Sequence, residues 1–362
     1  MSLMREIEWG SCLLEPRRDP KFERRFRRAT GRPGGPVAYY SGTSWLEDTT
    51  VAFNVDATKQ ISIDPELIGL IGMIVSQDNS CRFCFAETRA LLLIFGMPER
   101  RISRLEHHLL TEEFNERERA ALEFARCVSR ANPSPGKSDL EKLRAAGYDE
   151  LQITEIASIA GLFVFFNRVT TFFALPPYAV EEMPNRWYVR FFRPLIAFWL
   201  SRSNSPARLQ PLEPDEREGM FSQIVLGLDG LPFARSLRKA IDGMWASTVL
   251  TRRSKALAMA VVARALDCPL TEREVTETLL DEGLQREQVG EILAHLTSPA
   301  LEPKEKLIVS FARETVWYEP ARVQQLGREA MRTLSREEFI ELVAVTSMAN
   351  MICRLGAVVG AS

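Results

Sequence analysis

An internal repeat, in which residues of the first half recur in the second at one fixed spacing, constrains the fold of this chain more than any other feature of its sequence. The tripeptide Phe124-Ala125-Arg126 recurs as Phe311-Ala312-Arg313. Five more pairs keep the same spacing to within one position: Cys81 and Cys268, Glu87 and Glu274, His108 and His295, Glu155 and Glu341, and Arg168 and Arg354. Self-similarity at one fixed spacing indicates repeated folding units. We therefore expect a tandem duplication, with copies at about 60–175 and 245–360.

The repeated unit is predicted to be helical. After Asp64 the apolar residues follow helical spacing, and Val, Ile and Thr rarely alternate with polar residues as a strand requires. Asp64-Pro65-Glu66 supplies an N-cap, a proline at the first helical position and an acidic first turn. Further helices are expected from the cysteines at 81 and 84 to Gly96, and at about 99–110, 115–130, 138–146 and 150–173. Ser138 and Glu141 would form a capping box. The predicted fold class is all-α.

The chain divides into four segments by composition: an N-terminal arm at 1–59, a helical domain at 60–180, a linker at 181–214 and a second, degenerate helical domain at 215–362. The arm is rich first in arginine and then in glycine and proline, so we expect extended structure packed on the helices. The prolines of the linker predict a break in regular structure. Its aromatic and basic stretch at 186–193 is expected to clamp the linker to the two domains, and a membrane contact is the less favoured alternative.

The composition is that of an ordinary soluble protein. A net charge of −2 over 362 residues gives no basic footprint for a nucleic-acid partner. The N-terminus lacks the apolar core of a secretory signal, and no uninterrupted apolar run approaches the length of a membrane span. We therefore expect a cytoplasmic location, where a close pair of cysteines is typically catalytic or metal-binding rather than a structural disulfide.

Cys81 and Cys84 form such a pair at the start of a predicted helix. Thiols at these positions lie one turn apart at the positive end of the helix dipole, which favours the thiolate. The alternatives are two buried small apolar side chains, or a metal site, which is less favoured because no second cysteine or histidine cluster supplies more ligands. In the second copy Thr271 stands where the first has Cys84, so only the first copy is expected to be active. The second copy would then serve as a built-in dimerisation partner, and the other four cysteines are expected to be packed or incidental thiols.

The string Val75-Ser76-Gln77-x-Asn79-x-Cys81-x-Phe83-Cys84, with Asp64-Pro65-Glu66-Leu67 before it and Asn167-Arg168 after it, resembles the carboxymuconolactone decarboxylase and AhpD-like alkylhydroperoxidase superfamily. The resemblance covers 60–175 well and 245–360 weakly. It implies an AhpD-like helical bundle, duplicated in tandem, that forms a homo-oligomer and needs no cofactor. It also implies that Cys84 attacks a hydroperoxide, that Cys81 closes the disulfide, and that a lipoyl or thioredoxin-like partner reopens it.

Two positions depart from the superfamily's pattern. Thr88 stands where a histidine would accept the thiol proton, and Gly69 stands where a glutamate would complete the relay. Losing a general base typically costs about 10²–10⁴-fold in rate. Glu87, Glu66 and His108 are the candidate substitutes, with His108 also open to a role in the shared architecture.

These observations lead to one main functional hypothesis and two alternatives. The main one is a thiol-dependent peroxidase or disulfide oxidoreductase that cycles the Cys81-Cys84 pair, with activity altered by Thr88 and Gly69. A disulfide reductase survives the loss of the histidine better, because it needs no base to activate a peroxide. The first alternative is a catalytically inactive helical protein that binds a ligand or another protein. The second is a decarboxylase-like reaction without a cofactor.

Overall fold

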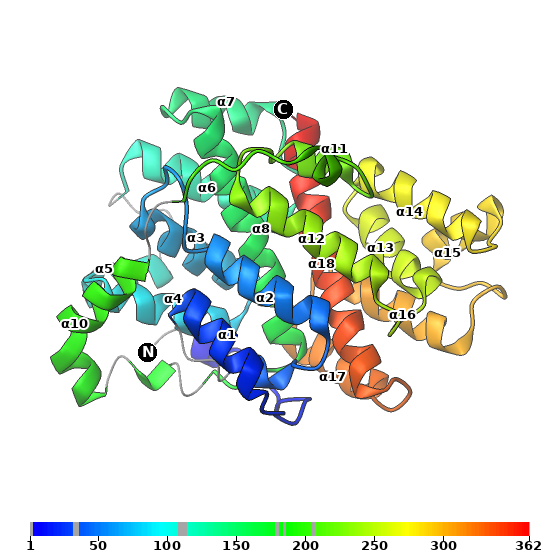
Figure 1. The fold of residues 1–362 in the computed structure, drawn as a ribbon, viewed down its shortest axis with the longest axis horizontal. Helices are drawn as coiled ribbons and strands as arrows, with labels where there is room; N and C mark the ends of the chain where they lie inside the picture. The colour runs from blue at the N-terminus through cyan, green and yellow to red at the C-terminus, as the bar shows by residue number, and fades with distance from the viewer. Residues whose placement is uncertain are drawn as a thin grey trace.

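The computed structural model of the chain describes residues 3–31, 36–107, 114–177, 181–183, 186–203 and 207–361. Regular structure in these ranges is helical, apart from one isolated bridge between Gln210 and Gly230. The all-α class predicted from the sequence is confirmed. Figure 1 shows the helices gathered around a central pair, α8 and α18.

The first half contains η1 (Leu3–Glu6), α1 (Pro20–Thr30), η2 (Pro36–Tyr39), α2 (Ser44–Asp56), α3 (Pro65–Asp78), α4 (Arg82–Ile94), α5 (Glu99–His107), α6 (Glu116–Arg130), α7 (Lys137–Ala145) and α8 (Glu150–Phe172). The helices expected between 64 and 173 are all present. The capping box predicted for the 138–146 helix is wrong, because the chain enters α7 two residues earlier: Gly136 is the N-cap and its N–H donates to Asp139.

The remainder contains α10 (Trp187–Ser203), η4 (Pro214–Arg217), α11 (Ser222–Leu226), α12 (Pro232–Ala246), α13 (Arg252–Ala265), α14 (Pro269–Asp281), α15 (Arg286–His295), α16 (Pro303–Glu314), α17 (Pro320–Ala330) and α18 (Arg336–Ala361). Its helix α13 packs on α14, α16 and α18 as α3 packs on α4, α6 and α8 in the first half. The described part of the chain therefore presents two halves with the same helix order.

The centre of the molecule is the contact between α8 and α18. Gly161 of α8 lies so close to Leu355 of α18 that an added Cβ would be 3.1 Å from the leucine Cδ2 atom. Both helices are long and apolar enough to cross a bilayer, yet 83% and 89% of their most apolar windows are buried inside the protein. They are the core helices around which the two halves are arranged.

Two buried arginines fasten the halves to each other in a reciprocal way. Arg168 of α8 donates from Nε to the Thr315 carbonyl at 3.0 Å, and Arg354 of α18 donates from Nε to the Ser129 carbonyl at 2.8 Å. Both guanidinium groups also donate to the Val316 carbonyl. Each half thus supplies the backbone acceptors that the other half's arginine needs, since a buried cation without acceptors is strongly destabilising.

The repeated glutamates also have a structural role. Glu155 accepts hydrogen bonds from the backbone N–H groups of Ile61 and Ser62, just before α3. Glu341 accepts one from Leu250, at 3.0 Å, just before α13. Each carboxylate therefore fixes the entry of the chain into the helix that leads to a cysteine turn.

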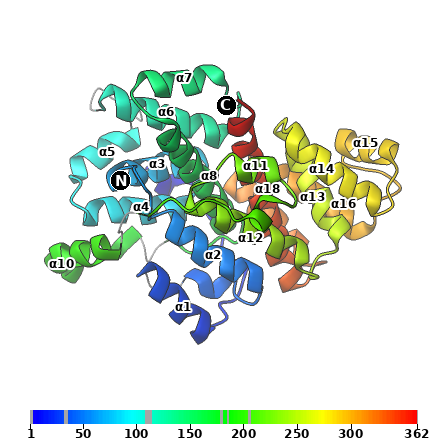
Figure 2. The same cartoon turned by 45° about the horizontal axis from the view of Figure 1, so that its top comes forward.

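The arm and the linker contain more helix than the sequence suggested. Asp19 caps α1 by accepting from the N–H groups of Lys21 and Phe22, and Gly31 ends it at φ 71°. The prolines expected to break the linker mostly flank α10, and Pro194 alone lies inside it. Figures 1 and 2 both place α10 at the edge of the molecule beside the first half.

Candidate functional site

The cysteine turn is built by the end of α3. Ser80 takes a left-handed conformation at φ 50°, so that the chain reverses between α3 and α4. Cys81 then becomes the N-cap of α4, and its sulfur accepts the backbone N–H of Cys84 at 3.4 Å. The second half repeats this turn, with Asp267 at φ 48° before Cys268.

The polar residues before the cysteines anchor the turn rather than take part in chemistry. The Ser76 hydroxyl donates to the Asn167 side chain at 3.0 Å, and the Asn79 amide donates to the Ser129 hydroxyl at 2.7 Å. Asp78 accepts two ion pairs, from Arg126 and Arg130. The Ser-Gln-Asp-Asn string therefore ties the turn to α6 and α8.

The Thr170 hydroxyl brings the two thiols together from the opposite side. Its Oγ1 atom lies 3.1 Å from the Cys81 sulfur and 3.2 Å from the Cys84 sulfur. Thr170 belongs to α8 and is 7% exposed, and the two cysteines are 0% and 4% exposed. Both thiols are free. Thr170 is the residue that sequence analysis missed, because nothing in the cysteine string points to a side chain 86 positions further on.

The two thiols differ in acidity. Burial opposes ionisation of Cys81, but hydrogen bonds from the Cys84 thiol, from Thr170 and Thr171, and from the Cys84 backbone N–H lower its pKa. Burial raises the pKa of Cys84 well above its ordinary value, and the neighbouring Cys81 raises it further. Hydrogen bonding therefore favours negative charge on Cys81 over negative charge on Cys84. The superfamily resemblance implies Cys84 as the attacking sulfur, and that assignment stays a prediction.

The two positions that depart from the superfamily's pattern, Gly69 and Thr88, lie in the packing of α3 and α4. A Cβ atom at Gly69 would lie 2.6 Å from Cδ2 of Leu92, so a longer side chain there would require the leucine to move. Thr88 is buried, and its hydroxyl donates to the Cys84 carbonyl at 2.8 Å. Both positions are committed to packing between and within α3 and α4.

The three residues expected to replace the relay, Glu87, Glu66 and His108, do not all lie near the thiols. Glu87 lies near Cys84, and its negative charge contributes to the raised pKa of that thiol. Glu66 is half exposed and pairs with Arg101 at 2.5 Å, so it is engaged at the far end of α3. His108 lies outside the described residues, and His295 at the repeated position is exposed. Of the three candidates, Glu87 alone is shown beside the thiols.

Aromatic side chains from other parts of the chain surround the pair. Tyr40, from the segment before α2, is buried, and Tyr318, from the second half, packs its ring edge-on against Phe172 at 5.0 Å. Burial raises the pKa of both phenols, and a charge on Cys84 would raise each further. Arg82 pairs with Glu181 at 2.7 Å. The described residues that interact with the thiols thus include two buried tyrosines.

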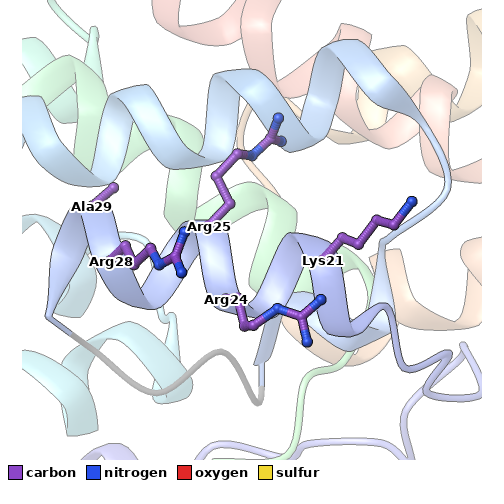
Figure 3. Close-up of a pocket in the computed structure, with 5 residues that line it drawn as sticks. All are labelled: Lys21, Arg24, Arg25, Arg28 and Ala29. Atoms are coloured by element: carbon purple, nitrogen blue, oxygen red, sulfur yellow. The ribbon is translucent and has the colours of Figure 1, made fainter.

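The described cavities lie elsewhere. One of about 1020 Å³ lies between α2 and α12 and is lined by Trp45, Asp56 and Lys239 among others. A shallower one of about 510 Å³ lies along α1, where Figure 3 shows Lys21, Arg24, Arg25, Arg28 and Ala29. Neither contains a cysteine. In the described ranges, no three His, Cys, Asp or Glu side chains gather as metal ligands.

The fold and the site together define an all-helical protein with a buried Cys-x-x-Cys dithiol bridged by a threonine. No protein family and no curated protein sequence matches the chain. Among solved structures, it is similar to an uncharacterized peroxidase-related protein from Silicibacter sp. TM1040, with 23% identity and a TM-score of 0.39. The similarity covers 48% of this chain and 94% of that one.

Proposed function

We propose that this chain is an AhpD-like thiol oxidoreductase, in tandem form, whose Cys81 and Cys84 alternate between dithiol and disulfide. The observation that carries the proposal is the convergence of both sulfurs on one hydroxyl, at 3.1 and 3.2 Å from Thr170 Oγ1. A shared hydrogen-bond partner holds two thiols side by side, as disulfide formation requires.

The favoured reaction is reduction of a disulfide substrate. The Cys81 thiolate attacks one substrate sulfur, and the other leaves as a thiolate and takes up the proton released by Cys84. The Cys84 thiolate then attacks Cys81 in the mixed disulfide and expels the second substrate sulfur. Two electrons pass to the substrate, and Cys81 and Cys84 become a disulfide. This order follows the lowered pKa of Cys81.

A hydroperoxide is the slower substrate in this proposal. Its cleavage releases an alkoxide that must be protonated at once, and the positions that would carry the relay are Gly69 and Thr88. Disulfide exchange needs no such relay, because the thiolate expelled from the substrate can itself accept the proton that Cys84 releases. The lost histidine therefore favours the reductase over the peroxidase.

The exchange partner is proposed to be a lipoyl or thioredoxin-like dithiol. Because neither cysteine is more than 4% exposed, a slim ring on a flexible arm fits this site better than a broad protein surface. Oxidised and reduced lipoamide are the probes to use.

The test follows each thiol by mass, because trypsin places all six cysteines in different peptides. Free thiols are alkylated before and after a pulse of oxidised lipoamide, and peptides 60–82 and 83–89 report Cys81 and Cys84. We expect these two thiols to disappear together and the Cys81→Ser variant to keep Cys84 free. The control is Cys127→Ser, a half-buried thiol on α6. Retention of both thiols at millimolar lipoamide and millimolar peroxide would overturn the proposal.

A second candidate function is that of a catalytically inactive helical protein that binds a small ligand. The cavity of about 1020 Å³ between α2 and α12 favours it. Burial raises the pKa of Asp56 in its lining to about 7, as in a polar site shielded from water. A Cys84→Ser variant with full cellular function supports this candidate, whereas loss of function supports the oxidoreductase.

We also propose a homo-oligomer, which covers the apolar face of α10. Trp187 and Phe191 are 75% and 74% exposed, and Leu195 and Phe198 are each 59% exposed. Exposed apolar patches of this kind mark interaction surfaces. Light scattering tests the proposal: Phe191→Glu should lower the measured mass, and an unchanged monomeric mass for the wild type contradicts it.

A further inference from the structure

The second half contains two thiols of its own, although its Cys-x-x-Cys string is broken. Cys268 is the N-cap of α14 and is 3% exposed. Cys353 lies on α18 and is 1% exposed. Gly356, which follows Cys353 by three positions on α18, lies against the Cys268 sulfur, so the two cysteines lie close together where α14 contacts α18. The sequence had predicted packed or incidental thiols at these positions.

The second half exchanges the positions of threonine and cysteine relative to the first. Thr271 occupies the position of Cys84, and its hydroxyl oxygen is 3.4 Å from the Cys268 sulfur. Cys353 occupies the position of Asn167, because each directly precedes the repeated arginine of its long helix. The first half thus holds two sulfurs on the turn and a hydroxyl on the long helix. The second holds one sulfur and a hydroxyl on the turn, and the other sulfur on the long helix.

Gly356 makes room for this arrangement. It stands where the first half has Thr170, since each lies two positions after the repeated arginine. A Cβ atom at Gly356 would lie 3.0 Å from the Cys268 sulfur, too close for unstrained contact. The Cys268 sulfur therefore lies against the bare backbone of α18, on the same helix as Cys353.

The two thiols are as unequal as those of the first half. A hydrogen bond from Cys353 is the main cause that lowers the pKa of Cys268 to about 6. Burial opposes this shift, and hydrogen bonds from Thr271 and the backbone add to it. Burial and the neighbouring Cys268 raise the pKa of Cys353 well above its ordinary value. At neutral pH the site holds one thiolate and one thiol, as thiol–disulfide chemistry requires.

We propose that Cys268 and Cys353 form a second dithiol site, which a small hydroperoxide oxidises to a disulfide between α14 and α18. The Cys268 thiolate attacks the outer peroxide oxygen, the O–O bond breaks, and the alkoxide takes a proton from solvent to leave as an alcohol. The positions equivalent to Gly69 and Thr88 are Ala256 and Val275, so this oxidation is slow, as it is at the first site. Cys353 then loses its proton and attacks the sulfenic sulfur of Cys268, and hydroxide leaves as water with that proton. The dithiol loses two electrons, and the peroxide gains them.

This inference does not depend on the proposed function of Cys81 and Cys84, and its test keeps the two apart. The Cys81→Ser/Cys84→Ser double variant and the wild-type chain are treated with hydrogen peroxide, alkylated and digested without reductant. Cys268 lies in tryptic peptide 265–273 and Cys353 in peptide 337–354. We expect a species with the summed mass of these two peptides in both proteins, and its loss on adding reductant.

A stability readout complements the mass measurement. The disulfide would close a loop from 268 to 353, so oxidation should raise the Tm of the double variant. Cys353→Ala and Cys353→Ser should each abolish the rise in Tm. If both variants give this result, misfolding of one of them does not explain it. Cys127→Ser is the matched control and should keep the rise. Free alkylated Cys268 and Cys353 after peroxide, in wild type and double variant alike, would overturn the proposal.

Discussion

The two thiol sites of this chain differ in where the second sulfur comes from. In the first half Cys81 and Cys84 share one turn, whereas in the second half Cys268 on the turn meets Cys353 from α18. A Cys81–Cys84 disulfide changes the conformation of a few residues. A Cys268–Cys353 disulfide joins two helices that are far apart in sequence. The same helix order therefore supports a local site and a cross-linking site.

What the sites share is the asymmetry of their thiols. In both, the cysteine at the helix entry has a lowered pKa, and its partner has a raised one. Both entry cysteines lie at the N-terminus of a helix, after a left-handed residue. Backbone N–H groups at a helix start stabilise a negative charge. The comparison indicates that the turn, rather than the Cys-x-x-Cys string, selects the thiolate.

The largest expected effect separates the two cysteines of the first half. Cys81→Ser should reduce lipoamide turnover on the order of 10³-fold or more, because it removes the attacking thiolate. Cys84→Ser should instead trap a mixed disulfide at Cys81 and allow a single turnover. Steady-state and single-turnover kinetics measure both. If a mixed disulfide were trapped on Cys84 in Cys81→Ser and none on Cys81 in Cys84→Ser, Cys84 would be the attacking thiol. The two sites would then not share the same asymmetry.

The next effect tests the symmetry of the interface. Arg168→Met and Arg354→Met should each lower the free energy of unfolding by about 2–4 kcal/mol, because buried carbonyls lose their donors. The double variant should lose less than the sum, since both arginines donate to the Val316 carbonyl. Chemical denaturation measures all three. The control is Arg144→Met at an exposed ion pair, where the change should stay below about 1 kcal/mol.

A smaller effect is expected at the hydroxyl that the second half lacks. Thr170→Val removes the group that lies against both sulfurs, so the pKa of Cys81 should rise and activity at neutral pH should fall about 10-fold. The pH–rate profile should move to higher pH, and Thr170→Ser should restore it. Thr346→Val, on α18, is the matched control because its hydroxyl bonds only to its own helix. An unshifted pH–rate profile in Thr170→Val would show that the Thr170 hydroxyl does not lower the pKa of Cys81.

The smallest effect is a titration in the second half. The pKa of Cys268 is lowered to about 6, so its thiolate should be present above that pH and protonated below it. The ultraviolet absorbance of thiolates, in wild type minus Cys268→Ala, should show one group with this midpoint. Cys353→Ala should move the midpoint upward because it removes a donor. A wild-type midpoint near the pKa of a free cysteine would contradict the lowered pKa of Cys268, and with it the asymmetry that the two sites share.

The sequence predicted what depends on neighbours in the chain. Asp64-Pro65-Glu66 marked the start of α3 correctly, since capping is local. The same signals, Asp19-Pro20 and Gly31, bound α1, although the arginine-rich composition of the arm had led us to expect extended structure there. The thiol pair at 81 and 84 was visible for the same reason, because it lies on one turn.

Contacts between distant helices could not be predicted in this way. Thr170 reaches the thiols, and Cys353 reaches Cys268, through the packing of one long helix on another turn. Leu92 fills the space beside Gly69 for the same reason. No spacing rule links such residues, because the angle and depth of helix packing decide which side chains meet.

The reciprocal arginines have a consequence for how the protein is made. Arg168 leaves the ribosome 148 residues before Val316, whose carbonyl it needs. At about 5–20 residues per second, translation of that stretch takes roughly 7–30 s. During this interval Arg168 has its acceptors in the first half, Asn79 and Val164, but lacks the Thr315 and Val316 carbonyls. The final packing of Arg168 therefore waits until the segment with Thr315 and Val316 has been made.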